Sequence, residues 1–512
     1  MTPHRDILSP AAITALFARA LRVESVGEQA DFCGLGGDDA AALDLAGRVR
    51  ATTGVGVRGW EVFDHPTPIQ YRSRLIELMD SATAPGPPRP RRSSEPVPLG
   101  PAQENMALIE RALGRAMFNV CQRIDVRGDV DRAALVAAVG DVAHRHEGLR
   151  IRLRAHGGRL VQQAAQRVQV PHRTVGVDSG DPEALVPAVV EAEMASAFDL
   201  TREPPIRSTL IEAAPDHAIL ILTLHHLSYD GRCKAIVRTD LARAYRARLS
   251  GDHAAPPPTL QLSDVMAWQH ERAEHADEHL DYWRSVCCDT RRVEPQSCYR
   301  KGHLTFAVPV DERLDLAAAE AAVTVQALLA TCYLAAIHEL DPEGGNRLPV
   351  VVQLDNREWH ESAEVVATLS NMVPIAVRRS VLGEIGVAAP EVHEALRNAC
   401  RHQELPSEAV FARLGGIPDG FPRYGFGILE REGRSLRVPG GVLQGRSARA
   451  NEDEVDPSSF DAVLELRPVP GMLECSLTYC VDHVGARRAA KLVADFRRSV
   501  ARSVRARRKV SA

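Results

Sequence analysis

The sequence is poor in aromatic residues and has neither a one-sided charge nor a long apolar run. Phe, Trp and Tyr make up 4% of its 512 residues, and 62 Lys and Arg stand against 67 Asp and Glu, a formal net charge of −5. Platforms for stacking bases and a basic face for phosphates are therefore missing. The longest largely apolar stretch, 321–337, contains Thr324 and Gln326 and is too short to span a bilayer comfortably. We expect no nucleic acid and no membrane as a partner.

The ten cysteines include no pair at metal-site spacing. No Cys-x-x-Cys occurs, and only Cys287 and Cys288 are adjacent. Scattered thiols of this kind are typical of reduced cysteines in a cytoplasmic protein, rather than of a disulfide framework or a zinc site. The first ten residues also lack the apolar core of a signal peptide. We therefore expect a cytoplasmic protein that binds no metal.

Length and composition predict several structural units. A chain of 512 residues is too long for one ordinary core, and an apolar content of 45% is enough to build more than one. The proline- and arginine-rich stretch 84–96 predicts a semi-extended linker between a unit formed by residues 1–83 and a larger remainder. In that remainder, strand-like segments such as 218–224 alternate with helical ones such as 132–145, which predicts mixed α/β layers.

The most informative segment is the run His225-His226-Leu227-Ser228-Tyr229-Asp230-Gly231, which directly follows the apolar stretch 218–224. Successive residues of a strand point to opposite faces, so only one of the two histidines can face a substrate. We predict that His226 does so and that His225 packs into the core. A neutral imidazole can accept the proton that an amine or hydroxyl loses when it attacks a thioester.

Asp230 and Gly231 complete this run. A carboxylate in the turn after the strand can fix local geometry by pairing with an arginine. A glycine lets the backbone approach a substrate without a Cβ in between. The structural alternative, for the run taken alone, is a histidine pair with satisfied hydrogen bonds beside an ordinary Asp-Gly turn.

Further segments occur in order on both sides of the run. They are Pro98-Leu99-Gly100-Pro101-Ala102-Gln103-Glu104-Asn105-Met106, Arg145-His146-Glu147-Gly148-Leu149-Arg150, Phe198-Asp199-Leu200 with Pro204-Pro205-Ile206-Arg207, Ser263-Asp264-Val265-Met266-Ala267-Trp268 with Asp281-Tyr282-Trp283, Ser370-Asn371-Met372-Val373-Pro374, and His402-Gln403-Glu404-Leu405-Pro406. Together they resemble the motifs of the condensation domains of nonribosomal peptide synthetases. Two departures are Gly100, where serine is usual, and Arg232-Cys233, where Trp-Ser commonly follows the Asp-Gly.

The resemblance implies a fold and a set of site residues. The fold would be two lobes like chloramphenicol acetyltransferase arranged in a V, which we place at 97–270 and 271–512. The catalytic residues would be His226 and, through its backbone amide, Gly231. His225 and Asp230 would be structural, with Arg150 as the expected ion-pair partner of Asp230 and Arg207 as the second choice. Ser228 and Asn371 are expected in the wall of a substrate tunnel.

The first 83 residues resemble a peptidyl carrier domain of four helices. Apolar positions at helical spacing over 13–22 precede the run Asp31-Phe32-Cys33-Gly34-Leu35-Gly36-Gly37-Asp38-Asp39. Carriers hold phosphopantetheine on the serine of a Leu-Gly-Gly-x-Ser motif, but Asp39 stands at that position and residues 38–44 contain no serine. We therefore expect no covalently bound cofactor, and a phosphopantetheine arm supplied by partner carrier proteins. An unrelated helical docking domain is the alternative.

The resemblance implies an amide-forming condensation enzyme. It would transfer an acyl or peptidyl group from a carrier-bound phosphopantetheine thioester to an acceptor amine that is free or carrier-bound. The donor would arrive in trans on a loaded carrier protein. Two alternatives remain open: an ester-forming or coenzyme A-dependent acyltransferase of the same fold, and a non-catalytic module that recruits carriers.

Overall fold

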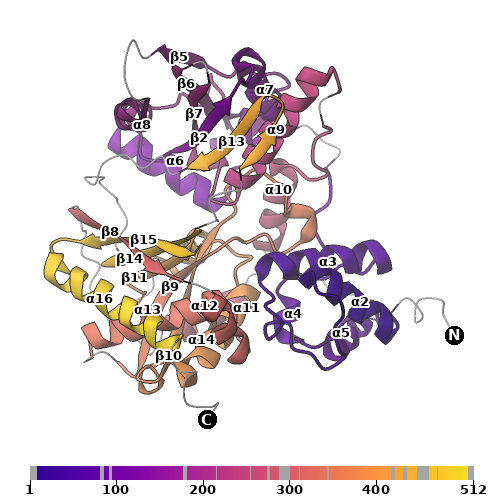
Figure 1. The fold of residues 1–512 in the computed structure, drawn as a ribbon, viewed down its shortest axis with the longest axis vertical. Coiled ribbons are helices and arrows are strands. Elements are labelled where there is room, and N and C mark those ends of the chain that lie inside the picture. Colours follow the sequence, from indigo (N-terminus) through magenta and orange to yellow (C-terminus); the bar gives the residue numbers. More distant parts are fainter. Residues whose placement is uncertain are drawn as a thin grey trace.

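The computed structural model describes most of the chain. The described ranges are 8–80, 86–91, 95–176, 182–214, 216–253, 255–273, 277–287, 300–310, 312–342, 345–416, 421–429, 435–446, 460–469 and 471–504. They form a small helical unit and two α/β lobes, and Figure 1 shows the helical unit beside the second lobe. The predicted fold class is confirmed, because each lobe has its own six-stranded sheet.

The N-terminal unit consists of four helices: α2 (Pro10–Leu21), α3 (Asp39–Thr53), α4 (Glu61–Asp64) and α5 (Pro68–Asp80). The side chain of Ser9 accepts a hydrogen bond from the Ala12 amide and begins α2, and Asp38 caps α3 in the same way. The helices pack around a core whose largest fully buried side chains are Phe17, Phe32 and Tyr71.

The first lobe is a six-stranded sheet with helices on both faces. Its strands and helices are β2 (Asn119–Gly128), α7 (Arg132–Arg145), β5 (His172–Gly176), η2 (Pro182–Leu185), α8 (Val186–Ala195), β6 (Ile206–Ala214), β7 (His217–His225), η3 (His226–Ser228) and α9 (Cys233–Ser250). Along β7, Leu220 and Leu222 pack with α7 and α9, whereas Ile219 and Ile221 pack with α8. The stretch predicted as a buried strand is therefore buried on both faces, and its end carries the two histidines.

The second lobe is a sheet of order β10-β9-β11-β14-β15-β8. Its elements are α11 (Asp277–Cys287), β8 (Lys301–Pro309), α12 (Glu312–Glu320), α13 (Val325–Leu340), β9 (Arg347–Leu354), η4 (His360–Ser362), β10 (Asn371–Arg378), η5 (Arg379–Val381), α14 (Ile385–Arg401), α15 (Ser407–Leu414), β11 (Tyr424–Ile428), β14 (Ala462–Val469), β15 (Met472–Cys480) and α16 (Gly485–Ser503). Eleven consecutive residues of α13 are buried, because α14, α16 and the sheet surround this helix.

The predicted boundary at residue 270 needs a correction, because two strands from the second half of the chain belong to the first lobe. The hairpin of β12 (Leu436–Val438) and β13 (Gly441–Arg446) adds to the edge of β2, so that the first sheet has the order β12-β13-β2-β7-β6-β5. Val438 and Leu443 are buried in the first-lobe core, which explains the crossing. Figure 1 shows these orange strands beside β2.

A third set of elements lies where the lobes meet. It comprises β1 (Val97–Pro98), α6 (Pro101–Leu113), η1 (Glu147–Arg150), β3 (Ile151–His156), β4 (Arg159–Ala164) and α10 (Leu262–Ala273). Strands β1, β4 and β3 form a small sheet of their own. Its core includes Leu262 of α10 and also Val365, Ala367 and Leu369 from the second half of the chain. A segment of the second lobe therefore reaches into the junction, directly beside the end of β7.

Two further predictions concern the redox state of the cysteines and the presence of a membrane-spanning helix. Seven cysteines are free thiols in the described part of the chain, but Cys480 is disulfide-bonded, so the expectation of reduced thiols is wrong for Cys480. Within the described ranges no single helix has the length and apolar character to cross a membrane; the bent pair α12 and α13 meets that test only when both are taken together.

Candidate active site

His225 is the histidine that the fold immobilises. Its side chain is 1% exposed, its Nε2 lies 2.9 Å from a carboxylate oxygen of Glu110 on α6, and its Nδ1 accepts a hydrogen bond from the Leu227 amide at 3.0 Å. The ring of Phe198 packs edge-on against it. Because both ring nitrogens are engaged, His225 has no nitrogen left for a substrate. The structure thus places it where the sequence predicts a packed histidine.

His226 has a different environment. Its backbone amide donates to the Phe118 carbonyl at 2.7 Å and its carbonyl accepts from the Thr368 hydroxyl, so the backbone is held from both lobes. The side chain is half-buried, and its Nδ1 is buried without a hydrogen-bond partner in the described part of the chain. Burial lowers the pKa of His226 below 6.5, and the imidazole is therefore neutral at neutral pH. A neutral imidazole with a free nitrogen can accept a proton.

Asp230 is tied to Arg357, and the expected pairing with Arg150 is wrong. Two guanidinium nitrogens of Arg357 contact the two carboxylate oxygens of Asp230 at 3.0 and 3.1 Å, and both side chains are fully buried. Burial alone would raise the pKa of the Asp230 carboxyl, but the adjacent Arg357 holds it below its usual range. The second choice, Arg207, is also wrong, since its guanidinium lies over the ring of Phe198.

The physical reason for this error is the direction of the side chains. Arg150 ends η1 and donates to the Ala165 carbonyl, directly across the end of the β3–β4 ladder. Arg357 comes from the loop after β9, 127 residues from Asp230 in sequence. One signal could have indicated it: the run Leu354-Asp355-Asn356-Arg357 follows an apolar strand, as the histidine run follows β7.

A segment from the second lobe, residues 365–370, clamps the loop after β7. The hydroxyl of Thr368 accepts from the Tyr229 amide at 3.1 Å and donates to the His226 carbonyl. The amides of Leu369 and Ser370 donate to Asp230 at 3.0 and 3.1 Å. On its other side this clamp segment passes Gly148, where a Cβ would overlap the Val366 carbonyl. That close approach requires glycine in the Arg-His-Glu-Gly-Leu-Arg run.

Two residues that were expected in a tunnel wall are enclosed instead. Ser228 is fully buried, and its hydroxyl donates weakly to the His225 carbonyl at 3.4 Å. Asn371 is 3% exposed, and its amide group holds the backbone of the loop 403–407 through three hydrogen bonds. Both side chains are used for local structure because the turn and the loop leave backbone groups that need partners. The tunnel-wall prediction is therefore wrong for both.

Gly231 lies at the open side of the clamped loop. A Cβ at this position would meet no atom within 4 Å, and its φ is not in the left-handed region. Neither the backbone conformation nor the packing requires glycine at position 231. The remaining explanation for glycine is that it keeps space open beside the loop. Next to it, the guanidinium of Arg232 lies 4.0 Å from Asp355, and the thiol of Cys233 donates to Asp230 at 3.2 Å. The role of the Gly231 amide in catalysis stays a prediction.

In the N-terminal unit, the position of the expected serine is the first residue of α3. Asp39 is exposed at the surface of the unit, as are its neighbours Asp38 and Ala40. Its pKa is raised to about 7, because desolvation and the charges of Asp38 and Asp355 all oppose ionisation. A phosphopantetheine arm is attached through a hydroxyl, which a carboxylate lacks. The residues present here do not fit the arm.

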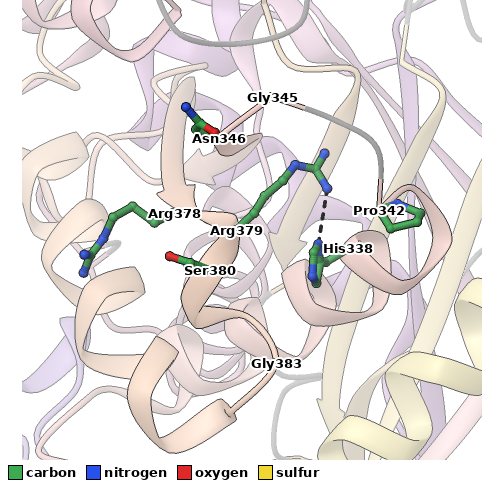
Figure 2. A pocket seen from close by; sticks show the side chains of 8 residues that line it. All are labelled: His338, Pro342, Gly345, Asn346, Arg378, Arg379, Ser380 and Gly383. Atoms are coloured by element: carbon green, nitrogen blue, oxygen red, sulfur yellow. Dashed lines mark hydrogen bonds between the residues drawn. The ribbon is translucent and has the colours of Figure 1, made fainter.

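One cavity, of about 570 Å³, lies away from these residues. It is lined by His338, Pro342, Gly345, Asn346, Arg378, Arg379, Ser380 and Gly383. Figure 2 shows Arg379 bonded to His338 at its rim. Arg378 pairs with Arg347 at one end of the β9–β10 ladder, whereas the clamp and Arg357 follow the other end, where Asn371 pairs with Leu354. The cavity is therefore not part of the site around His226. No cluster suited to a metal ion occurs within the described ranges.

Two family models match the chain. The model of the condensation domain matches residues 93–415, and the model of the phosphopantetheine attachment site matches residues 11–70. The first match covers the loop after β7, the clamp segment and Arg357. The second covers α3 with Asp39, α4, nearly all of α2 and the first residues of α5.

Curated relatives are much longer than this chain. A probable non-canonical nonribosomal peptide synthetase, CymA of Salinispora arenicola, is 29% identical over 439 residues, which are 81% of this chain and 5% of CymA. The phosphinothricin tripeptide synthetase PhsB of Streptomyces viridochromogenes is 28% identical over 444 residues, 81% of this chain and 36% of PhsB. The chain thus spans well under half the length of these relatives.

Solved structures share the fold. The X-domain from teicoplanin biosynthesis, in its complex with OxyB, has a TM-score of 0.68 at 22% identity and covers 83% of this chain and 96% of its own. The first condensation domain of the CDA synthetase has a TM-score of 0.66 at 19% identity, with 81% and 97% covered. These similarities show that residues beyond the N-terminal unit adopt the two-lobed condensation fold.

Proposed function

Because the chain belongs to the condensation domain family, we propose that it transfers an acyl or peptidyl group from a carrier-bound phosphopantetheine thioester to an acceptor amine. The observation that carries this proposal is the neutral, partly exposed imidazole of His226 at the end of a buried strand. Arg357 and the clamp segment hold the loop around it, so the imidazole has a defined position.

In the proposed reaction, His226 orients the attacking amine and accepts its proton. The amine nitrogen forms a bond with the thioester carbonyl carbon, the carbon–sulfur bond breaks, and the proton passes to the departing sulfur. The open side at Gly231 leaves room for the carbonyl oxygen, which its backbone amide would stabilise as negative charge develops. Amide formation needs no further reactant.

We further propose that the thioester comes from another protein. Asp39 has no hydroxyl for an arm, so the N-terminal unit carries no substrate at that position. Carrier domains loaded elsewhere would then supply the donor in trans. A soluble coenzyme A thioester is the alternative donor, and an alcohol acceptor would give an ester.

Intact-protein and product mass spectrometry test the proposal. The same acyl group is offered on a carrier protein and on coenzyme A, with candidate amines and alcohols as acceptors. We expect amide formation from the carrier-bound donor, and a loss of about 10²- to 10⁴-fold in rate for His226→Ala with an unchanged unfolding transition. His144→Ala is a matched control, because His144 is an exposed histidine at the end of α7. Normal rates for His226→Ala would contradict the assignment.

Recruitment without catalysis is the second candidate. It is favoured by the structural similarity to an X-domain that is solved in complex with OxyB. The partly exposed imidazole of His226 beside the intact Asp230-Gly231 pair argues for catalysis instead. Binding of loaded carriers without turnover, under every donor and acceptor combination, would favour recruitment.

A further inference from the structure

The N-terminal unit is fastened to the second lobe through a buried charged cluster around Arg58. The guanidinium of Arg58 lies 2.9 Å from a carboxylate oxygen of Glu404 and 3.2 Å from one of Glu358. It also lies over the rings of Trp60 and Trp359, 5.7 and 5.4 Å from their centroids. Only 2% of each glutamate side chain is exposed. Burial raises the pKa of Glu358 to about 7 and Arg58 lowers it, so the departure of Arg58 would remove the cation that favours the charged form of this carboxyl.

A second charged contact lies along α14. Asp64 at the end of α4 accepts from Arg397 at 3.0 Å and from Arg401 at 2.8 Å. Beside it, His393 packs edge-on against Phe63, and its pKa is lowered to about 4, first by burial and then by Arg397. His393 is therefore neutral and forms part of an apolar contact. The same face of the N-terminal unit thus provides both charged and apolar contacts.

Close packing and the linker restrict the unit further. The ring of His360 in η4 occupies the space that a Cβ at Gly47 of α3 would need. In the linker, the Arg91 amide donates to Asp264 at 2.7 Å, and Trp268 donates to the Gly86 carbonyl at 3.2 Å. The described linker residues Gly86 and Arg91 therefore contact α10. A carrier that swings between partners needs a free face, and this face is in use here.

The position of Asp39 agrees with this arrangement. The negative charge of Asp355 in the second lobe contributes to the raised pKa of Asp39, and Asp39 in turn contributes to the raised pKa of the Cys400 thiol. Asp355 contacts Arg357, which holds Asp230. The face that carries the former attachment position therefore points toward the loop after β9, on the side of the catalytic loop. Figure 1 shows the N-terminal helices against the lower, second lobe.

We propose that the N-terminal unit is a fixed cap on the second lobe and not a mobile carrier: Arg58 and Asp64 lock it onto Glu358, Glu404 and α14, and it closes this face to carrier domains of other proteins. The occupant of the face is the chain's own unit, so a loaded carrier must dock on another surface. This proposal concerns the position of the unit and does not depend on the proposed reaction.

Hydrogen exchange of the full chain, followed by mass spectrometry, tests the docking. For the double variant Arg58→Ala/Asp64→Ala we expect exchange in α14 and in residues 355–362 to become about tenfold faster or more, with β7 unchanged. Glu77→Ala is the matched control, because its exposed carboxylate pairs only with Arg74 on the same helix among the described contacts. Exchange identical to the unmodified chain in the double variant would overturn the proposal.

A reciprocal variant guards against a simple folding defect. Arg397→Ala/Arg401→Ala removes the partners of Asp64 and leaves the N-terminal sequence untouched. We expect faster exchange in α4 while α2 keeps its protection. If α4 is as protected as before, the unit is not held by these contacts and the proposal fails.

A serine at position 39 tests whether the docked unit is closed to other proteins. A phosphopantetheinyl transferase is a protein and must cover the face around residue 39 to load it. With coenzyme A, we expect Asp39→Ser to acquire the arm at least about tenfold more slowly than Asp39→Ser combined with Arg58→Ala and Asp64→Ala, read as the mass increase of the intact chain. Equal loading of the two variants would show that the face is open and would overturn the closure.

Discussion

The loop after β7, which carries His226, and the loop that leads into α3 at Asp39 are both held by side-chain hydrogen bonds and packing. In the first, Asp230 and Arg357 form a buried pair, and the clamp segment binds the backbone. In the second, Asp31 accepts from the Gly34 amide, Asp38 caps α3, and Phe32 packs against Phe17. The supporting residues are present in both loops, but only the first keeps a group that can react. A loop can therefore keep its architecture after its chemistry is lost, because different atoms serve the two purposes.

The largest expected effect breaks the support of the active loop. Arg357→Ala leaves Asp230 as a buried, unpaired carboxylate, so we expect a loss of about 3–5 kcal/mol in the free energy of unfolding. Urea unfolding of the condensation lobes, followed by circular dichroism, measures it. Arg150→Ala is the control, because its guanidinium bonds a carbonyl and not Asp230. A larger loss for Arg150→Ala would contradict the assignment of the ion pair.

The second prediction concerns pH, because the pKa of His226 is lowered whereas the pKa of Asp39 is raised. Burial lowers the pKa of His226 below 6.5, so the neutral form persists at neutral pH. We expect a rate that is constant from pH 8 to 6.5 and then falls up to about tenfold per pH unit below the pKa of the folded enzyme. Stability falls as the pH drops from 6.5 to the lower pKa of folded His226, because in this range the unfolded chain takes up a proton that the folded chain does not.

Asp39 shifts in the opposite direction, to a pKa of about 7. Its contribution to stability is present below pH 3.8 and is lost as the pH rises through 7, since ionisation is harder in the folded chain. In the Asp39→Asn variant, the plot of rate against pH should still show the fall at low pH that we assign to protonation of His226. Loss of that fall in Asp39→Asn, measured as product formed per minute across pH, would show that the two loops are not independent.

A smaller effect is expected from the clamp. Thr368→Val removes the hydroxyl that joins the His226 carbonyl to the Tyr229 amide and keeps the shape of the side chain. We expect a loss of about 0.5–1.5 kcal/mol in stability, because both hydrogen bonds of the Thr368 hydroxyl are lost while the Tyr229 amide keeps the His226 carbonyl as acceptor, together with a lower kcat at nearly unchanged KM. Thr368→Ser restores the hydroxyl and should recover kcat. A rise in KM alone would indicate that Thr368 contacts substrate and does not position His226.

The smallest effect belongs to the loop before α3. Asp38→Ala removes the cap of α3 and should cost the N-terminal unit about 0.5–2 kcal/mol. Local exchange of α3 measures this loss, and we expect turnover of the condensation lobes to be unchanged. Asp44→Ala, which removes an i,i+4 pair with Arg48 on the same helix, should have less effect. A large fall in turnover for Asp38→Ala would mean that the two loops are coupled.

Much of the fold could be predicted from local patterns. The apolar stretch before the histidines became β7, and the helical spacing over 13–22 corresponds to α2. The lobe boundary was less accurate, because β12 and β13 return to the first sheet after more than 300 residues of intervening chain. Nothing in a short hairpin sequence indicates which of two sheets it will join; the apolar surface available beside β2 decides this.

In the candidate site, too, some features could be predicted from local patterns and others could not. The two histidines differ as strand alternation predicts, since His225 is saturated and His226 has a free nitrogen. Ser228 and Asn371 were misjudged because a polar residue beside a motif can serve the backbone as readily as a substrate.

The sequence by itself determined which functional side chains this protein has. They are a histidine pair at the end of an apolar strand, an aspartate in the turn that follows, and an aspartate in place of the serine that would carry a phosphopantetheine arm. The tertiary structure alone decided which partners these groups meet. Arg357 reaches Asp230 and Arg58 reaches Glu404 across 127 and 346 positions of sequence. Such pairings depend on how buried charges are satisfied when separate cores pack together, and this is a property of the whole fold that no local pattern contains.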